Sequence, residues 1–550
     1  MRSKFQFFSV LIAFLIVPAL RVNATTYNVK AGGGGNFTTI QACAKTAVAG
    51  DTCDVFAGTY NETPSLNTSG SSGQPITFSV NPGDCVTVQG FNINSGVSYI
   101  VIGNPSGAAT CTTNGFAHPG FYVTGNPIQF STASNITIEG NYVYSVGSDC
   151  LSGPGTISQG TATYFYVLNN VLDTCGGTGN VGSAGGIGME GNHWLVDGNT
   201  FQHVADGMYA YGSYLVIRNN HFGPINQAEE GSNHPDGIES TCGGPGQDYP
   251  LVHMLYEGNT TEQWRDTDGH GLLLRDINAC GQTMNILRFN QMIVLGSNFI
   301  SNDGSGTTAG TKTFIYNNSV SNTQRDSSPE YSDLTFTQGG TGAVVINNIF
   351  QDDWTESPPY CIYVDDTSTS GFVENHNLCF YSGFSGTWQT GSQGAYSSTD
   401  IFNQDPKFVG ETTDLHLQSG SPAIGAGGPL TAAVGSGASS TSLTAGNAAL
   451  FSDGYGLTGV QGDWIRIGSS TTVQIASINY SSNMLTLAAP VSWSNGDAIY
   501  LYKNSTGTVV LNGANPNIGF DPSAGSSGGG SSGGGSQPPL PPTNVKAVAQ

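Results

Sequence analysis

The chain has 550 residues, of which 15 are basic and 38 acidic, so its formal net charge is −23. Charged residues make up 10% of it, against about 25% in an average globular protein. Proteins bind nucleic acid through clustered Lys and Arg, so this composition argues against nucleic acid as a partner. Hydrophobic residues account for 37%, enough to bury a large core, and 78 Gly and 25 Pro fall short of a low-complexity composition.

The first 24 residues have the features of a secretory signal peptide. Arg2 and Lys4 precede an apolar run over 5–20, and small residues follow at 22–24. Cleavage is expected after Ala24. No later apolar run is long enough to span a membrane. The mature chain is therefore expected to be secreted or held at the cell surface, without a transmembrane segment.

All ten cysteines follow this segment, and none has a zinc-binding spacing. An even number of cysteines in an exported chain predicts disulfides, although the sequence permits on the order of a thousand pairings. Consecutive pairing is preferred, because each separation is one coil or less of the repeat described next and stacked coils place Cα atoms about 5 Å apart. The expected pairs are Cys43–Cys53, Cys85–Cys111, Cys150–Cys175, Cys242–Cys280 and Cys361–Cys379.

One pattern recurs between residues 130 and 385: alternating apolar residues, an Asn, then further apolar residues. The marking residues, 29.5 positions apart on average, are Asn141, Asn170, Asn199, Asn220, Asn259, Asn290, Asn318, Asn348 and Asn377. A period of this size is typical of a solenoid, and the two-residue alternation predicts strands. Stacked strands would place successive Asn side chains about 4.8 Å apart, so a hydrogen-bonded ladder of Asn in left-handed turn conformation is expected.

The two ends of this region carry recognisable motifs. TYNVKAGGGGNFTTIQACAKTAVAGDTCDVFAGTYNE (26–62) resembles an N-terminal cap, and DPKFVG, DLHLQSGSPAIGAG and NPNIGFD resemble closing coils. Through them the chain resembles the right-handed parallel β-helix superfamily, the pectin-lyase-like proteins, over about 25–425 and near 508–522. The resemblance implies an all-β solenoid whose open end is covered by a short helix at about 39–47.

The Asn repeat is absent from residues 430–504, where short alternating runs predict a small all-β module inserted between closing coils. Tyr455, Trp464 and Trp493 are expected in its core, with stacking on sugar rings as the alternative. A Gly/Ser-rich and then Pro-rich stretch follows. The expected organisation is a signal peptide (1–24), the β-helix (25–429), the inserted module (430–504), a closing segment (505–522) and a flexible tail (523–550).

Acidic and imidazole residues recur at one position of consecutive repeats. They appear when GIGME (186–190), DGMYAY (206–211), HPDGIES (234–240) and TDGHGLLLRD (267–276) are aligned on Gly. The candidate catalytic residues are Asp206, Asp236, Glu239 and His270. The candidate substrate-binding residues are Tyr209, Tyr211, His234, Asp268 and Arg275.

Three interpretations of this cluster stay open. Asp-Gly pairs are common in turns, so the cluster can be purely structural. Glycoside hydrolysis needs one protonated and one ionised carboxyl, and adjacent or alternate coils offer separations of about 5 or 10 Å. A polysaccharide lyase would hold Ca²⁺ through Asp206, Asp236 and Glu239, with Arg265 or Arg275 as base or clamp. No other cofactor is indicated.

HPDGIE and GHG are similar to strand motifs of the polygalacturonase-like hydrolases. This resemblance implies a hydrolase in which Asp236 is one catalytic carboxyl and Asp206 or Glu239 the other, with His270 orienting or relaying a proton. Because so acidic a surface repels polyanions unless Ca²⁺ is bound, the expected partner is a neutral or weakly charged extracellular polysaccharide. A non-catalytic glycan-binding or adhesive rod is the alternative from another class, and the sequence gives no oligomeric state.

Overall fold

A computed structural model provides the structure of the protein. The residues that it describes are 24–104, 111–144, 146–153, 163–176, 185–204, 206–223, 236–242, 251–261, 270–276, 283–293, 300–303, 312–322, 333–337, 342–352, 361–365, 370–382 and 396–523. The expected signal peptide up to residue 23 and the expected tail from residue 524 lie outside them.

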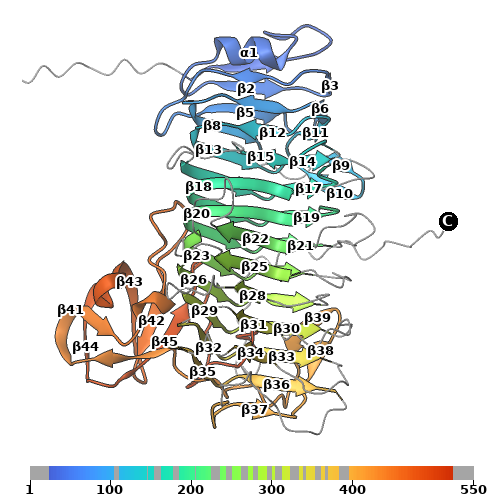
Figure 1. Ribbon diagram of the computed structural model, residues 1–550. Coiled ribbons are helices and arrows are strands. Elements are labelled where there is room, and N and C mark those ends of the chain that lie inside the picture. The colour runs from blue at the N-terminus through green and yellow to red at the C-terminus, as the bar shows by residue number, and fades with distance from the viewer. Residues whose placement is uncertain are drawn as a thin grey trace, which may run out of the picture.

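The chain coils into a stack with three strand-bearing faces per turn, and parallel pairing joins each face from coil to coil (Figure 1). Face one comprises β4 (Ser65–Leu66), β7 (Phe91–Ile93), β12 (Ile128–Phe130), β15 (Leu151–Ser152), the first halves of β18 (Gly185–Asp197) and β20 (Asp206–Arg218), β22 (Asp236–Cys242), β25 (His270–Asp276), β28 (Ile300–Asp303), β31 (Leu334–Thr337) and β34 (Ile362–Val364). Face two comprises β1 (Thr26–Val29), β2 (Thr52–Val55), β5 (Ile76–Val80), β8 (Ser98–Gly103), β13 (Ser134–Glu139), β16 (Thr163–Leu168), the second halves of β18 and β20, β23 (Leu251–Glu257), β26 (Thr283–Arg288), β29 (Lys312–Tyr316), β32 (Val344–Ile346) and β35 (Val373–Asn375).

Face three is a separate 13-stranded parallel sheet. It comprises β3 (Gly58–Tyr60), β6 (Val86–Val88), β11 (Tyr122–Thr124), β14 (Tyr142–Tyr144), β17 (Val171–Asp173), β19 (Thr200–Gln202), β21 (His221–Phe222), β24 (Thr260–Thr261), β27 (Gln291–Ile293), β30 (Ser319–Asn322), β33 (Ile349–Asp352), β36 (Leu378–Tyr381) and β37 (Ile401–Phe402). Two antiparallel hairpins flank the stack: β9 (Cys111–Thr113) with β10 (Phe116–His118), and β38 (Phe408–Gly410) with β39 (Asp414–Leu417). The predicted parallel β-helix is confirmed.

Alternating burial fills the inside of the coils. In β5, for example, Ile76, Phe78 and Val80 are buried while Thr77 and Ser79 are partly exposed, as a strand with one core-facing side requires. The helix α1 (Ile40–Thr46) closes the N-terminal end, where the side chain of Thr39 caps it and Ile40 and Cys43 face the core. The described residues contain no helix with the length and apolar character needed to cross a membrane.

The Asn ladder forms as predicted. Each ladder Asn is at least 99% buried. From Asn170 onward its side-chain oxygen accepts hydrogen bonds from the backbone N–H and the amide of the Asn one coil earlier, for example Asn199 to Asn220 at 2.9 and 3.0 Å. The prediction that the ladder Asn residues themselves take the left-handed conformation is wrong. Positive φ values belong to the preceding residues, such as Gly198 and Asn219, so these make the turn and the ladder Asn satisfies buried backbone groups.

Four of the five predicted disulfides are present: Cys43–Cys53, Cys85–Cys111, Cys150–Cys175 and Cys361–Cys379. Their Cα atoms are 5.2 to 6.2 Å apart, within the range that a disulfide spans. The fifth expected pair involves Cys280, which lies outside the described residues. Disulfides of this number are typical of proteins from oxidising compartments.

Residues 431–503 form a closed six-stranded antiparallel barrel beside the coils (Figure 1). Its strands are β40 (Thr431–Val434), β41 (Gly437–Ala445), β42 (Trp464–Ile467), β43 (Thr471–Asn479), β44 (Met484–Trp493) and β45 (Ala498–Lys503). Tyr455 and Trp493 belong to the barrel core, as expected, whereas Trp464 is partly exposed. After the barrel the chain returns to the coils, where the Asn317 amide donates to the Asn517 carbonyl oxygen at 2.8 Å.

The barrel packs against the outer side of face two. Leu195, Val216, Leu255 and Ile286 join the barrel residues in one apolar cluster. Within this contact the buried Arg288 guanidinium donates to Asp463 of the barrel at 2.7 and 2.8 Å and to Glu257 of β23 at 2.6 Å. The apolar contact and the buried charges together fix the barrel to the coils.

Candidate functional site

The predicted site lies at the start of three neighbouring face-one strands. Parallel pairing places Asp206 of β20 opposite Asp236 of β22, and Asp236 opposite His270 of β25. In the same register Tyr209 lies opposite Glu239. The coil repeat therefore brings together side chains that are up to 64 residues apart in the sequence.

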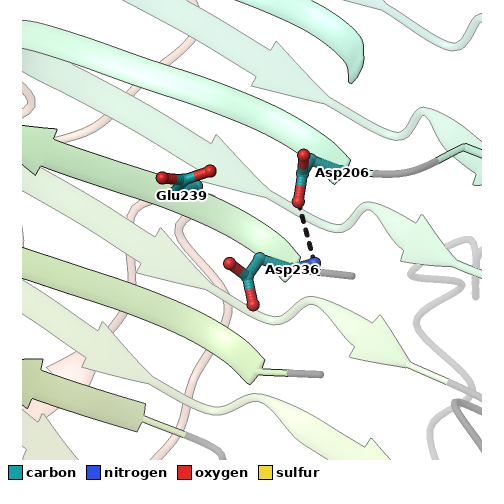
Figure 2. A group of neighbouring side chains, drawn as sticks. All are labelled: Asp206, Asp236 and Glu239. Atoms are coloured by element: carbon teal, nitrogen blue, oxygen red, sulfur yellow. Dashed lines mark hydrogen bonds between the residues drawn. The ribbon is translucent and has the colours of Figure 1, made fainter. Parts of the chain in front are cut away.

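The carboxyl groups are linked to neighbouring coils by hydrogen bonds (Figure 2). Asp206 Oδ1 accepts the backbone N–H of Asp236 at 3.0 Å. Asp236 Oδ1 in turn accepts the backbone N–H of His270 at 3.0 Å and contacts its Nδ1 at 2.8 Å. Asp236 is thus fixed between two strands, and it holds the His270 imidazole in one orientation.

Tyr209 reaches Asp206 because the local strand departs from regular alternation. Residues three apart on a regular strand point to opposite faces, yet the Tyr209 hydroxyl donates to the Asp206 carboxyl. Gly207 lies between them, and a Cβ there would be 2.5 Å from the Gly237 carbonyl oxygen and from the Phe222 ring. On the preceding coil a Cβ on Gly185 would be 3.2 Å from the Tyr209 ring. Gly185 therefore leaves room for the Tyr209 ring, whereas Gly207 leaves room for the Gly237 backbone and the Phe222 ring.

Burial and charge favour the protonated form of Asp206. The carboxyl is 3% exposed, and burial, with the negative charges of Asp236 and Glu239, raises its pKa well above the usual range. Hydrogen bonds from Tyr209 and the Asp236 N–H oppose part of this rise. Asp236 is fully buried, whereas Glu239 is partly exposed. Glu239 is therefore the most accessible of the three carboxyls.

Two further carboxyl groups border the cluster and were missed by the sequence analysis. Asp149 accepts the Gly185 N–H at 2.8 Å, and burial raises its pKa. Glu190 follows Gly188 by two residues, and burial raises its pKa to about 7. The aligned segment GIGME (186–190) contained Glu190, and parallel pairing places this residue opposite Tyr211 of β20.

The other predicted site residues are placed as follows. Tyr211 is on β20 and only 7% exposed, so its ring offers little surface to a sugar. Arg275 is on β25, but the position of its side chain is not described. His234, Asp268 and Arg265 lie outside the described residues.

Asp206, Asp236 and Glu239 also form a possible cation site. One oxygen from each lies within 4.8 Å of the others, and carboxylate oxygens are the ligands that Ca²⁺ prefers. Ca²⁺ takes about six to eight oxygens, however, and Oδ1 atoms of both Asp residues already accept N–H groups. The donor chemistry fits Ca²⁺, but these residues supply only part of a coordination shell.

No family model matches the chain, and no curated protein matches its sequence. Similar solved structures include an alginate lyase from Paenibacillus sp. str. FPU-7 (13% identity, TM-score 0.31, 69% of this chain and 99% of that one). Others are a GH136 lacto-N-biosidase from Eubacterium ramulus (11%, 0.37, 65% and 68%) and the catalytic unit of a GH87 alpha-1,3-glucanase from Streptomyces thermodiastaticus strain HF3-3 (16%, 0.34, 70% and 70%). Such distant likenesses concern the fold alone, so the activity of this chain has to follow from its own residues.

Proposed function

We propose that this protein is a secreted carbohydrate-active enzyme that hydrolyses a neutral or weakly charged extracellular polysaccharide. The observation that carries the proposal is the group of three carboxyls on two adjacent strands, one oxygen of each lying within 4.8 Å of the others. Burial and like charge raise the pKa of one member, Asp206. Glycoside hydrolysis requires such a pair of one protonated and one ionised carboxyl. The disulfides favour an extracellular location.

The proposed roles follow from exposure and hydrogen bonding. Asp206 is the proposed source of the proton for the leaving oxygen, and Tyr209, which contacts its carboxyl and is more exposed, relays it. In this relay the Tyr209 hydroxyl turns from Asp206, gives its own proton to the leaving oxygen and takes the proton of Asp206. Glu239 attacks the anomeric carbon as the ionised carboxylate. Asp236 is buried, so its proposed role is to position Asp206 and His270 rather than to touch the sugar.

The short separation favours retention of configuration. Carboxyls of retaining glycosidases are about 5–5.5 Å apart, whereas inverting enzymes leave about 6.5–9.5 Å for a water molecule. One oxygen of each of the three carboxyls lies within 4.8 Å of the others, and this supports the shorter separation. Glu239 then forms a glycosyl ester with the sugar. Asp206, now ionised, takes a proton through Tyr209 from the water that cleaves this ester, and the Glu239 carboxylate is released.

The test of this proposal is incubation with neutral and acidic polysaccharides while reducing ends are measured. A hydrolase releases reducing ends without ultraviolet-absorbing unsaturated products, and NMR of the first product gives its anomeric configuration. Activity should fall as the pH rises through the raised pKa of Asp206, because the acid then loses its proton.

A second candidate, a Ca²⁺-dependent polysaccharide lyase, is favoured by the same three carboxylates if they bind a cation. Bound Ca²⁺ would neutralise a uronate carboxylate and acidify its α-proton. Chelator-sensitive release of unsaturated products would support it. Glycan binding without turnover would instead support the non-catalytic rod.

A further inference from the structure

Three aromatic residues of the barrel lie outside its core. In β42 the buried Ile465 and Ile467 face inward, so the alternation of the strand places Trp464 on the outer side. Tyr500 and Tyr502 of the neighbouring strand β45 are partly exposed as well. None of these three rings belongs to an apolar cluster of the described residues. Packing of the core therefore does not explain them.

Both basic residues of the barrel lie beside these rings, on the neighbouring strands β42 and β45 (Figure 1). Arg466 and Lys503 are the only Lys or Arg between residues 431 and 503. Lys503 is opposite Trp464 in the register, and its Nζ atom lies 4.7 Å from the centre of the indole ring and 5.9 Å from that of the Tyr502 ring. Arg466 is opposite Tyr500, and its guanidinium carbon lies 4.3 Å from the centre of that ring.

Neither cation has an acidic partner among the described residues. Their ion pairs involve other Arg and His side chains. Arg466 is 8% exposed and donates to two backbone carbonyl oxygens, whereas Lys503 is partly exposed. The three acidic residues of the barrel are bound elsewhere, since Asp463 binds the coils and Asp453 and Asp497 accept backbone N–H groups.

We name this surface the barrel patch, and it consists of Trp464, Arg466, Gln474, Tyr500, Tyr502 and Lys503. Its own charge is positive, although the whole chain carries −23. At physiological ionic strength charges are screened over about 8 Å, so distant acidic residues affect an ion at the patch only weakly. The local cations therefore favour an anionic ligand.

We propose that the barrel patch binds an acidic polysaccharide, one whose sugar rings carry a carboxylate or a sulfate group. The rings of Trp464 and Tyr502 stack on the apolar faces of the sugars. Lys503 has three ammonium donors on a flexible stem, so it turns from the rings toward the acidic group and leaves the indole face to the sugar. The amide of Gln474, which lies opposite Trp464 on β43, bonds to sugar hydroxyls.

This binding site is separate from the carboxyl cluster. The cluster lies on strands of face one, whereas the barrel packs against face two. Binding at the barrel patch needs no turnover, so the inference stands apart from the proposed hydrolase. Where both hold, the barrel keeps the enzyme within a matrix that contains acidic glycans beside its neutral substrate.

The test is electrophoresis of the mature protein through gels that contain polygalacturonate, its fully methyl-esterified form or a sulfated galactan. The ester keeps the sugar rings but removes their charge. A chelator is present throughout, so that polygalacturonate cannot bind through Ca²⁺ at the three carboxyls of face one. Wild-type protein should be retarded by at least one of the two acidic glycans and not by the ester, and added salt should weaken the retardation.

Two variants locate the binding. Lys503→Gln should bind at least about tenfold more weakly, because it loses a charge-assisted hydrogen bond. Trp464→Leu should also bind about tenfold more weakly, since it keeps an apolar side chain but loses the stacking ring. Lys45→Gln, which removes an exposed cation on α1, is the matched control and should bind like wild type.

The inference is overturned if neither acidic glycan retards wild type, or if the ester retards it as strongly as polygalacturonate. It is also overturned if Lys503→Gln and Trp464→Leu keep full retardation while circular dichroism shows a native fold. Glu239→Gln distinguishes this inference from the proposed function, because it should bind like wild type while it loses turnover. Retained turnover in Glu239→Gln would contradict the hydrolase mechanism and leave the barrel patch standing.

Discussion

At the scale of single residues, the chemistry depends on which carboxyl keeps its proton and which one the sugar can reach. Asp206 and Asp236 are buried, while Glu239 is partly exposed on the same face. Burial next to like charges raises the pKa of Asp206 and so favours its protonated form. The proposed division of roles between Asp206 and Glu239 rests on these surroundings.

Glu239→Gln tests this division. The variant should lose about 10²- to 10⁴-fold in turnover, because an amide is a poor nucleophile, while its melting temperature stays close to that of wild type. The matched control is Glu139→Gln, which alters a partly exposed Glu on β13. Equal turnover in both variants would refute a catalytic role for Glu239.

Glu374 predicts a pH dependence of stability. Burial, with the hydrogen bond to Asp400 and its charge, raises the pKa of Glu374 from 4.5 to about 9. Between these values the folded protein keeps a proton that the unfolded chain has lost, so the free energy of unfolding should fall as pH rises from about 4.5 to about 9. Chemical denaturation should show a weaker fall in Glu374→Gln. The exposed Glu411→Gln is the control, and an unchanged slope in Glu374→Gln would contradict the argument.

At the scale of elements, the Asn ladder joins one coil to the next. Asn220 donates to the Val196 carbonyl oxygen at 3.0 Å and to Asn259 at 2.9 Å, and its own oxygen accepts from Asn199. Removing this side chain takes the acceptor from the buried Asn199 backbone N–H and one hydrogen bond each from Val196 and Asn259 on the two neighbouring coils. The ladder is therefore a main determinant of register.

Asn220→Ala should lower the free energy of unfolding by roughly 1–3 kcal/mol for each group left unpaired. Asn219→Gly, at the preceding turn position with φ of 53°, should cost less because Gly adopts this conformation readily. Urea denaturation of both variants measures the difference. Equal losses would show that the ladder bonds add nothing beyond the turn.

Much of the solenoid could be predicted because its signal repeats. The intervals between the Asn residues predicted the coils. The same spacing predicted that Asp206, Asp236 and His270 lie side by side on neighbouring strands. Asp173 and Gln202, which form a buried hydrogen bond on face three, were missed because they do not precede Gly. Their signal was a different offset: Tyr144, Asp173 and Gln202 each follow a ladder Asn by three residues.

At the scale of the whole molecule, the barrel is fixed to the stack through buried charge. Arg288 and Asp463 are 175 residues apart and both fully buried. No local pattern in the sequence links them, so the all-β module could be predicted but its docking could not. Short alternating runs carry the period of a strand but not the identity of a tertiary partner.

Arg288→Met should destabilise the protein by about 3–5 kcal/mol, because it leaves the carboxylates of Glu257 and Asp463 buried without their cation. Lys45→Met, a charge removal at the exposed end of α1, should change stability by less than about 0.5 kcal/mol. Thermal unfolding of both variants is the measurement. A melting temperature like that of wild type in Arg288→Met would mean that the buried charges do not fix the barrel.

The measurement that tests the central claim most directly is the product analysis of the mature protein with a panel of neutral and acidic polysaccharides, with and without Ca²⁺. A retaining hydrolase of a neutral or weakly charged glycan should release reducing ends, form no unsaturated product and be unaffected by a chelator. Unsaturated products that require Ca²⁺ would contradict the hydrolase account. The absence of any product with glycan binding retained would contradict catalysis altogether.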